Sequence, residues 1–373
     1  HGHTWPPGLA RWRSADMPLK VIQWATGGVG RAAIEAIVAH PDLELVGCWV
    51  SSEAKDGKDV GEILGTEPLG IVATSDTESL LAMDADCVLY SPIMADRSLV
   101  CRMLASGKNV VTPLGWFFPG SRDVSDLEQA CREGESTLHG TGIHPGGITE
   151  RFPLMVSALS ASITHVRAEE FSDIRTYGAP AVISDIMLFG KTPEEAAASP
   201  MVDFLGDGFG QSMEMIVAEL GFAVDPEPLS LHEVAVATRP IESPIGTIEP
   251  GHVAAQRFTW QRTVAGEPVV TVRVNWFMGE QGFDTGWSFG PEGERFEVEV
   301  SGDPSSTVVF HGWHPESVAA GLVRNPGIVA TANHCVSAVP YVCEAGAGIK
   351  TYLDLPLVAG RAAPHLGVAQ PPP

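Results

Sequence analysis

Short apolar segments alternate with amphipathic helical patterns along the first 150 residues. Continuous apolar runs between turn-forming residues predict buried strands, whereas apolar positions three or four residues apart predict helices. The predicted strands are Leu19–Trp24, Leu43–Val50, Cys87–Tyr90, Asn109–Thr112 and Ser136–His139. The predicted helices are Gly30–Ala39, Val60–Leu64, Thr77–Met83, Ser98–Ser106 and Val124–Gly134. Strands that alternate with helices in this way predict a parallel sheet covered on both faces.

The pattern changes from about residue 152. Helical patterns come first, at Pro153–Ser162, Pro180–Phe189, Pro193–Ala198 and Gln211–Leu220. Alternating apolar and polar positions then predict strands at Leu229–Ala237, Gln256–Thr263, Val269–Met278, Trp287–Phe289, Phe296–Ser301 and Thr307–Gly312. The stretch Glu316–Cys343 is helical again. We therefore expect an α/β first domain and an α+β second domain with a mixed or antiparallel sheet.

These changes divide the 373 residues into five parts. We expect a dinucleotide-binding domain over 17–150, a substrate and dimerisation domain over 151–322, and a helical segment over 323–360 that returns to the first domain. Residues 361–373 form a tail. Residues 1–16 lack the apolar region of a secretory signal and are interpreted as an extension or an expression remnant.

Composition narrows the possible partners. The net charge of −23 disfavours nucleic acid and anionic membrane surfaces, because their phosphates would be repelled. No apolar run approaches the ~18 residues that a membrane-spanning helix needs. The six cysteines form no C-x-x-C pair, which favours buried, reduced thiols in a cytoplasmic protein.

A glycine-rich turn between the first strand and the first helix gives the strongest functional signal. The turn reads Ala25-Thr26-Gly27-Gly28-Val29-Gly30, with Ala25 in place of the first glycine of a G-x-G-x-x-G motif. Gly27 allows a pyrophosphate close to the backbone, and Gly30 allows the helix to pack close to its strand. The free N–H groups that begin the helix favour phosphate. This context predicts a Rossmann-type domain that binds a nicotinamide dinucleotide.

The end of the second strand bears on which dinucleotide is bound. An acidic residue for the ribose hydroxyls is expected there, but the strand ends in Ser51 and Ser52, with Lys55 nearby. Two hydroxyls and a lysine suit a 2′-phosphate, so we favour NADP over NAD. The acidic Glu53, which follows Ser52, is the residue that favours NAD instead. Two other strand ends, at Ser91-Pro92 and at Thr112, are also expected at the cofactor.

These residues together resemble a known family. The turn Lys20–Arg31, the strand Leu43–Ser52, the segments Gly107–Val111 and Gly140–Gly146, and the stretch Asn333–Leu355 resemble the dihydrodipicolinate-reductase-like group. Within that group they are most similar to 2,4-diaminopentanoate dehydrogenases and native NADP-dependent amine dehydrogenases of actinobacteria. The resemblance implies a homodimer, hydride transfer at a carbon–nitrogen bond, and a cofactor contact at Asn333.

Two departures from the family pattern matter. The Asp-Ala-Pro-Ser-Gly-Thr signature of the lysine-biosynthesis reductase is absent, so that activity is not expected. The amine dehydrogenases carry a glutamate soon after the fifth strand, whereas the corresponding stretch here, Pro113–Pro119, has no carboxylate. Another residue would have to bind the ammonia or iminium group.

Several residues could manage charge during hydride transfer. His144, in a loop at the domain junction, could donate to a carbonyl or imine near neutral pH. Glu169, Glu170 and Asp173 open the second domain, and one of them could replace the missing carboxylate. In strand alternation, Glu169 shares a face with Phe171, and Glu170 shares the other face with Ser172. Tyr177 resembles a pocket tyrosine of the family. We take His144, Tyr177 and Glu169 as the catalytic candidates.

The remaining candidates concern the substrate. Trp116, Phe117 and Phe118 would form an apolar wall which, with His144 and Tyr177, favours a small hydrophobic ketone, aldehyde, imine or amine. Arg175 is the only arginine near this expected pocket that could bind a substrate carboxylate.

The histidines do not predict a metal site. The pair His311 and His314 lacks further ligands at a suitable spacing. His232, His252 and His334 are interpreted as structural.

Three functions remain open on the sequence alone. The first is NADP-dependent reductive amination of small hydrophobic carbonyl compounds, with the reverse amine oxidation. The second is reduction of preformed imines or carbonyls without ammonia handling, which the missing glutamate favours. The third is a sensor or scaffold that binds NADP without turnover, because a fold does not decide activity.

Overall fold

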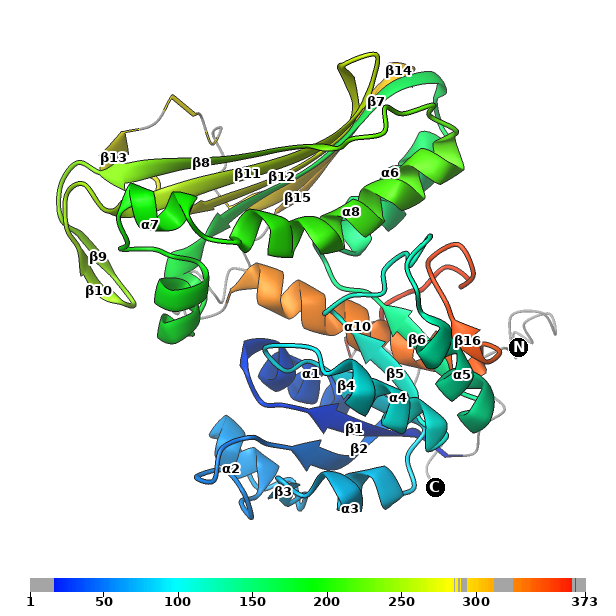
Figure 1. Cartoon of the computed structure of the whole chain (residues 1–373). Coiled ribbons are helices and arrows are strands. Elements are labelled where there is room, and N and C mark those ends of the chain that lie inside the picture. Colours follow the sequence, from blue (N-terminus) through cyan, green and yellow to red (C-terminus); the bar gives the residue numbers. More distant parts are fainter. Residues whose placement is uncertain are drawn as a thin grey trace.

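A seven-stranded parallel sheet forms the first domain (Figure 1). The computed structural model describes residues 17–363, except 285, 288, 290–293 and 312–324, and also residue 366. In space the strand order is β16-β6-β5-β4-β1-β2-β3. The strands are β1 (Leu19–Trp24), β2 (Leu43–Trp49), β3 (Ala73–Thr74), β4 (Cys87–Tyr90), β5 (Asn109–Thr112), β6 (Thr137–Gly140) and β16 (Gly348–Ile349). This confirms the predicted Rossmann-type sheet.

Helices cover both faces of this sheet. One face carries α1 (Gly28–Ala39) and α10 (Pro326–Glu344), which pack against each other over β1, β4 and β5 through apolar residues such as Ile34 and Val336. The other carries α3 (Thr77–Ala82), α4 (Arg97–Ala105) and α5 (Ser125–Gly134). The short α2 (Val60–Leu64) lies at the β2–β3 end. The C-terminal part of the chain thus supplies both a helix and an edge strand to the first domain.

The second domain is built on a mixed sheet with the strand order β13-β8-β11-β12-β7-β14-β15. Its strands are β7 (Ala161–Asp173), β8 (Leu229–Ala237), β11 (Val253–Val264), β12 (Glu267–Phe277), β13 (Phe283–Asp284), β14 (Arg295–Asp303) and β15 (Ser306–His311). A separate hairpin joins β9 (Ile241–Ser243) and β10 (Gly246–Ile248). The pairing of β7 with β12 is parallel and the other pairings in the large sheet are antiparallel, so the sheet is of the mixed type that the sequence analysis allowed.

Helices cover the face of the second sheet that is turned toward the first domain (Figure 1). They are η1 (Gly147–Arg151), α6 (Phe152–Ser157), η2 (Ile174–Thr176), η3 (Val182–Ile186), α7 (Pro193–Ala197) and α8 (Met201–Leu220). Phe209 and Met213 of α8 pack on Phe258 and Val272 of the sheet. Among the described residues, no helix combines the length and the hydropathy that a membrane span requires.

Three predicted elements differ from the structure. Helix α8 begins at Met201, ten residues before the predicted start, because glycines such as Gly206 interrupt the apolar period where Trp260 packs close to the helix. The helix predicted to reach Ser162 ends at Ser157, because the long strand β7 already begins at Ala161. Trp287 and Phe289 are not in a strand and pack over the end of the sheet. Residues 316–324 of the last predicted helix lie outside the described part.

Candidate functional site

The glycine-rich turn has the backbone geometry of a phosphate site. Helix α1 begins at Gly28 with Gly27 as its N-cap. A Cβ on Gly30 would lie 2.1 Å from the carbonyl oxygen of Ala25, so this position accepts only glycine. A Cβ on Gly27 would meet no heavy atom within 4 Å, which leaves open space in front of the helix N-terminus. Free N–H groups facing open space at a helix start fit a pyrophosphate.

Ala25 takes the left-handed backbone conformation that the motif normally gives to glycine. Its φ is 77°, although L-residues with a side chain rarely adopt such values. The buried Gln23 supports this conformation, because its Nε2 lies 3.0 Å from the Ala25 carbonyl oxygen and 2.9 Å from Ser91 Oγ. Gln23 therefore ties the turn to the end of β4. Sequence reasoning missed Gln23, because a polar residue inside an apolar strand carries no motif.

The expected ribose-binding residues lie close to the turn. Lys55 Nζ donates to Thr26 Oγ1 at 3.0 Å, which brings an ammonium group to the glycine-rich turn. Ser51 and Ser52 are exposed at the end of β2, and Glu53 is exposed beside them. The structure thus joins Thr26 and Lys55 directly, a contact that the spacing in the sequence did not reveal.

The start of α10 connects the turn to the second domain. Asn325 caps α10 by accepting from the N–H of Ile328, and its Nδ2 donates to Thr176 Oγ1 at 2.8 Å. The side chain of Ile328 lies 3.1 Å from the position of a Cβ on Gly28. The segment that follows β7 is therefore linked to the phosphate turn through Asn325.

Two other residues that were expected at the cofactor differ in exposure. Asn333 is exposed further along α10. Thr112 is buried at the end of β5.

The aromatic run after β5 lies mainly at the domain junction. Phe117 is only 2% exposed, and a Cβ on Gly208 of α8 would lie 3.5 Å from its ring. The N–H of Phe118 donates to Gln211 Oε1, also on α8. Trp116 is partly buried against the core of the first domain. The run thus holds the two domains together, and Phe117 has little surface left for a substrate.

His144 is packed into the second domain. Its ring lies 4.7 Å from the ring centre of Phe209 and 6.2 Å from that of Phe296. Nδ1 lies 3.0 Å from Thr149 Oγ1, and the buried Nε2 has no hydrogen-bond partner in the described part of the chain. Burial lowers the pKa of His144 to about 3, so the imidazole is neutral at physiological pH. As a catalyst it could act only as a neutral hydrogen-bonding group.

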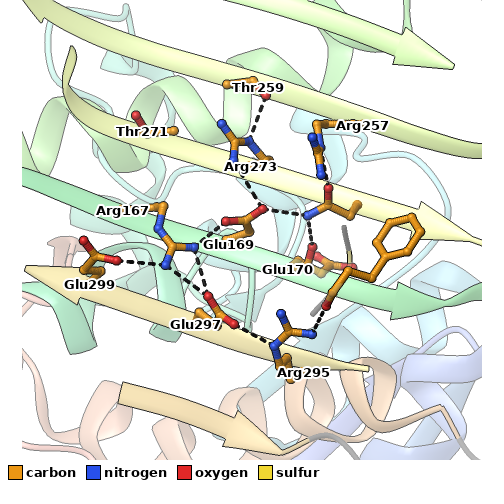
Figure 2. A network of polar contacts seen from close by, with 12 residues as sticks. Arg167, Glu169, Glu170, Arg257, Thr259, Thr271, Arg273, Arg295, Glu297 and Glu299 are labelled. Carbon is orange, nitrogen blue, oxygen red and sulfur yellow. Dashed lines mark hydrogen bonds and ion pairs between the residues drawn. The ribbon is translucent and has the colours of Figure 1, made fainter. Parts of the chain in front are cut away.

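The sheet separates the two adjacent glutamates, as the alternation predicts. Glu169 lies on the face opposite α8, where Arg167 and Arg273 pair with its carboxylate and Asn275 Nδ2 donates to Oε1 at 2.9 Å (Figure 2). This ion-pair network occupies the Glu169 carboxylate on the side of the sheet away from the first domain. Glu170 points to the other face, toward the helices.

Glu170 has one oxygen fixed and one without a described partner. Trp276 Nε1 donates to its Oε1 at 3.1 Å, and Ser172 Oγ donates to the same atom at 2.7 Å. Among the described residues, none donates a hydrogen bond to Oε2, and this oxygen atom is not completely buried. Burial raises the pKa of Glu170 to about 7. The carboxyl group can therefore change protonation state near neutral pH.

Tyr177 and Glu294 both interact electrostatically with Glu170. Tyr177 is half-buried, and both burial and the neighbouring Glu170 raise the pKa of its phenol. Glu294 is 1% exposed, and burial, together with Asp173 and Glu170, raises its pKa to about 8. Asp173 is paired with Arg175, whose Nε lies 2.9 Å from Asp173 Oδ1. Glu294 follows a proline- and glycine-rich stretch, and no sequence pattern marks it.

Several other histidines and cysteines make contacts that are typical of a structural role. His232 stacks on Phe258 and bonds to Gln256, and Tyr352 OH lies 3.3 Å from His334 Nε2. Burial raises the pKa of the Cys48 and Cys335 thiols to about 12, which disfavours thiolate chemistry there. In the described ranges, no group of three metal-ligating side chains comes together, and His314 lies outside those ranges.

Comparison with family models gives matches in both domains. Residues 148–365 match the C-terminal domain of 2,4-diaminopentanoate dehydrogenase. Residues 21–112 match the N-terminal domain of dihydrodipicolinate reductase.

Individual proteins give matches of different extent. An amine dehydrogenase of Streptomyces virginiae is 29% identical over 354 residues, which cover 91% of this chain and 96% of that protein. The 2,4-diaminopentanoate dehydrogenase of Acetoanaerobium sticklandii is 21% identical over a matched region that covers 91% of this chain and 94% of that protein. A 4-hydroxy-tetrahydrodipicolinate reductase of Synechococcus elongatus is 43% identical over only 63 residues, or 23% of that protein.

A solved structure, that of the amine dehydrogenase from Mycobacterium smegmatis, superimposes with a TM-score of 0.73. The match covers 93% of this chain and 98% of that one at 18% sequence identity. At this identity the likeness establishes the shared fold.

Proposed function

This chain belongs to the 2,4-diaminopentanoate dehydrogenase family, and on this basis we propose that it is an NADP-dependent oxidoreductase acting on a carbon–nitrogen bond. The proposed reaction is the reductive amination of small hydrophobic ketones or aldehydes, together with the reverse oxidation of the amines. Two relatives that match almost the whole chain, one named an amine dehydrogenase and the other a 2,4-diaminopentanoate dehydrogenase, support this reaction class.

The residues of the turn fit the proposed cofactor. The N–H groups from Gly27 to Gly30 would bind the pyrophosphate, and the open space in front of Gly27 leaves room for it. Thr26 and Lys55, with Ser51 and Ser52, would bind the 2′-phosphate that distinguishes NADP from NAD. When bound, NADP accepts or donates the hydride. The protein must then stabilise the charge on the substrate nitrogen.

The arrangement of Glu170 and Tyr177 carries the proposal for the chemistry. During amine oxidation, the substrate carbon loses a hydride, its nitrogen becomes an iminium cation, and water then releases the carbonyl compound and ammonia. Glu170 Oε1 is held by Trp276 and Ser172, which leaves Oε2 to stabilise this cation or accept its proton. Tyr177 would orient the nitrogen or the carbonyl oxygen. Glu170 would thus take the place of the glutamate missing from 113–119.

Steady-state kinetics of two neighbouring variants would test this assignment. In Glu170→Gln the side chain keeps its size and loses its charge, and we expect kcat/KM for amination to fall about 100-fold or more, in the range of general acid–base catalysis. Tyr177→Phe should cause a smaller loss. The matched control is Glu169→Gln, which removes the same charge on the opposite face and should keep kcat/KM within a few-fold once folding has been checked by circular dichroism.

The pH profile gives a second readout. Glu170 must be ionised to stabilise a cation, and its pKa is raised to about 7, so activity should increase as the pH rises through 7. Glu170→Gln should abolish that part of the profile. Equal losses in the two glutamine variants, or an unchanged profile in Glu170→Gln, would contradict the proposed role.

One observation favours a second function. The absence of a carboxylate from Pro113–Pro119 favours a reductase of imines or carbonyls that does not handle ammonia. NADPH consumption with a panel of linear and cyclic ketones, with and without ammonium, separates the two. Oxidation that requires ammonium supports amination, and oxidation without ammonium supports the reductase. Binding of NADPH without turnover across the panel would argue for a sensor and against both enzymes.

A further inference from the structure

Asn325 is buried between the two domains and forms hydrogen bonds in both directions. It is the N-cap of α10, the helix that lies between the first sheet and the second domain (Figure 1). Its Oδ1 accepts from the N–H of Ile328 at 2.9 Å, and its Nδ2 donates to Thr176 Oγ1 at 2.8 Å. Asn325 is only 6% exposed, so both bonds are shielded from water. One amide group therefore caps α10 and contacts the segment that follows β7.

On the side of the first domain, α10 rests on the phosphate turn. The Cδ1 atom of Ile328 lies 3.1 Å from the position that a Cβ on Gly28, the first residue of α1, would occupy. The contact between the two helices continues through apolar residues such as Ile34 and Val336. Because protein interiors are close-packed, α10 cannot shift without losing contacts to α1. The position of Asn325 is therefore fixed relative to the N–H groups that begin α1.

On the side of the second domain, Asn325 contacts the residue that precedes Tyr177. Thr176 is 4% exposed, and its Oγ1 also donates to the carbonyl oxygen of Asp173 at 3.1 Å. The N–H of Tyr177 donates to the carbonyl oxygen of Ile174 at 3.0 Å, within the same short helix η2. The backbone position of Tyr177 is therefore set by the helical turn that Asn325 contacts.

A second contact from the start of α10 reaches the strands that carry Glu170. A Cβ on Gly327 would lie 3.5 Å from the Cζ atom of Phe296. Phe296 on β14 is the cross-strand partner of Glu170 on β7. Both groups proposed for the chemistry, Glu170 and Tyr177, thus neighbour a residue that the start of α10 contacts. The first residues of α10 connect both groups to the phosphate turn.

We propose that Asn325 is a positioning residue that ties Tyr177 and Glu170 to the phosphate turn, so that a dinucleotide bound at the turn orders residues 174–177. Hydride transfer requires reacting atoms about 3–3.5 Å apart, and a misplacement of about 1 Å can cost roughly 100-fold in rate. A fixed link between the cofactor turn and the groups that hold the substrate would maintain this distance. The kinetic consequence rests on the proposed function, whereas the ordering of residues 174–177 does not require turnover.

Hydrogen exchange of the full chain, with and without NADPH, tests the link. Saturating NADPH should slow exchange at the amides of residues 174–177 about three-fold or more in the wild type, because fewer local openings remain. Asn325→Ser keeps a good cap for α10 but cannot reach Thr176, so this slowing should disappear. Thr176→Val breaks the same bond from the other side and should have the same effect. The control is Asp76→Ser, the corresponding change at the cap of α3, which should behave as the wild type.

Single-turnover kinetics tests the consequence for the reaction, with NADPH, ammonium and a ketone that the wild type accepts. Asn325→Ser and Thr176→Val should each slow NADPH oxidation in a single turnover about 10-fold. The double variant should be no slower than either single one, because both changes break one bond. The Kd for NADPH should stay within about three-fold of the wild type, since the turn itself is unchanged. Partial misfolding would lower the amplitude of the reaction and leave its rate unchanged.

The two measurements separate this inference from the proposed reaction. A wild-type chain in which NADPH does not slow exchange at residues 174–177 would overturn the proposal, as would slowing that persists in both variants. Losses of rate that add in the double variant would also contradict it. A wild-type chain that shows the expected exchange pattern but does not turn over any ketone would support the link and contradict the proposed function.

Discussion

Glu150 is a buried carboxyl group at the seam between the two domains. Its side chain is 0% exposed, and Ser212 Oγ donates to its Oε1. The other oxygen, Oε2, has no hydrogen-bond partner among the residues described. Burial raises the pKa of Glu150 from 4.5 to about 8. At pH 7 the folded protein therefore carries a neutral acid at this position, whereas the unfolded chain carries a carboxylate.

This difference makes stability depend on pH. Between about pH 4.5 and 8 the folded state binds more protons at Glu150 than the unfolded state, so the free energy of unfolding decreases as the pH rises. One pKa unit corresponds to about 1.4 kcal/mol, and the contribution of Glu150 falls by roughly 2.5 kcal/mol between pH 5 and pH 7. The variant Glu150→Gln can still accept from Ser212 but does not titrate. Its stability relative to wild type should therefore increase by on the order of 2 kcal/mol over this range.

Urea denaturation of both proteins at pH 5 and pH 7 measures this increase. Titration of all other groups is common to the two proteins and cancels in the comparison. Glu67→Gln, at an exposed position, is the control and should show the same stability difference from wild type at both pH values. If Glu150→Gln also differs from wild type by the same amount at both pH values, Glu150 is ionised in the folded protein and the reasoning from burial is wrong.

Two further predictions concern the glycine-rich turn. Ala25→Gly should raise the free energy of unfolding by roughly 1 kcal/mol, because glycine adopts a φ of 77° without steric strain; a decrease in chemical denaturation experiments would show that the alanine conformation is unstrained. Lys55→Ala should raise the Kd for NADPH by roughly 10- to 100-fold, the loss expected for one charged hydrogen bond, and leave the Kd for NADH nearly unchanged. Isothermal titration with both cofactors checks this, and an equal change for both would place Lys55 away from the 2′-phosphate.

The first domain could be predicted closely because its sheet is specified locally. Each buried strand, such as Cys87–Tyr90, is a continuous apolar run, and the helices between strands have their own periodicity. The two-residue strands β3 and β16 escaped prediction, because so short a strand exists only through its pairing with a neighbour. In the same way, the start of α8 depends on Trp260, which is distant in the sequence and packs against Gly206.

The candidate site could be predicted only where a motif or an alternation carried the information. The turn from Ala25 to Gly30 is a contiguous motif, and its geometry is consistent with the expected phosphate site. Gln23, Asn325 and Glu294 were not found, because their roles depend on contacts with segments distant in the chain. The effect of burial on His144 could not be predicted either, because its pKa of about 3 follows from packing against Phe209 and Phe296.

The pair Glu169 and Glu170 shows where sequence reasoning reaches its limit and how the structure goes beyond it. Alternation along β7 places the two carboxylates on opposite faces, but it cannot say which face turns toward the first domain. The packing of α8 on Val166 and Val272 decides this, because Glu170 shares the side of Val166. In the proposed function, this chain, which has no carboxylate in the loop after β5, supplies one from the second domain instead. On the other face of β7, the same alternation aligns Arg167 and Glu169 with the charges of β12 and β14, so their charges are paired within the sheet.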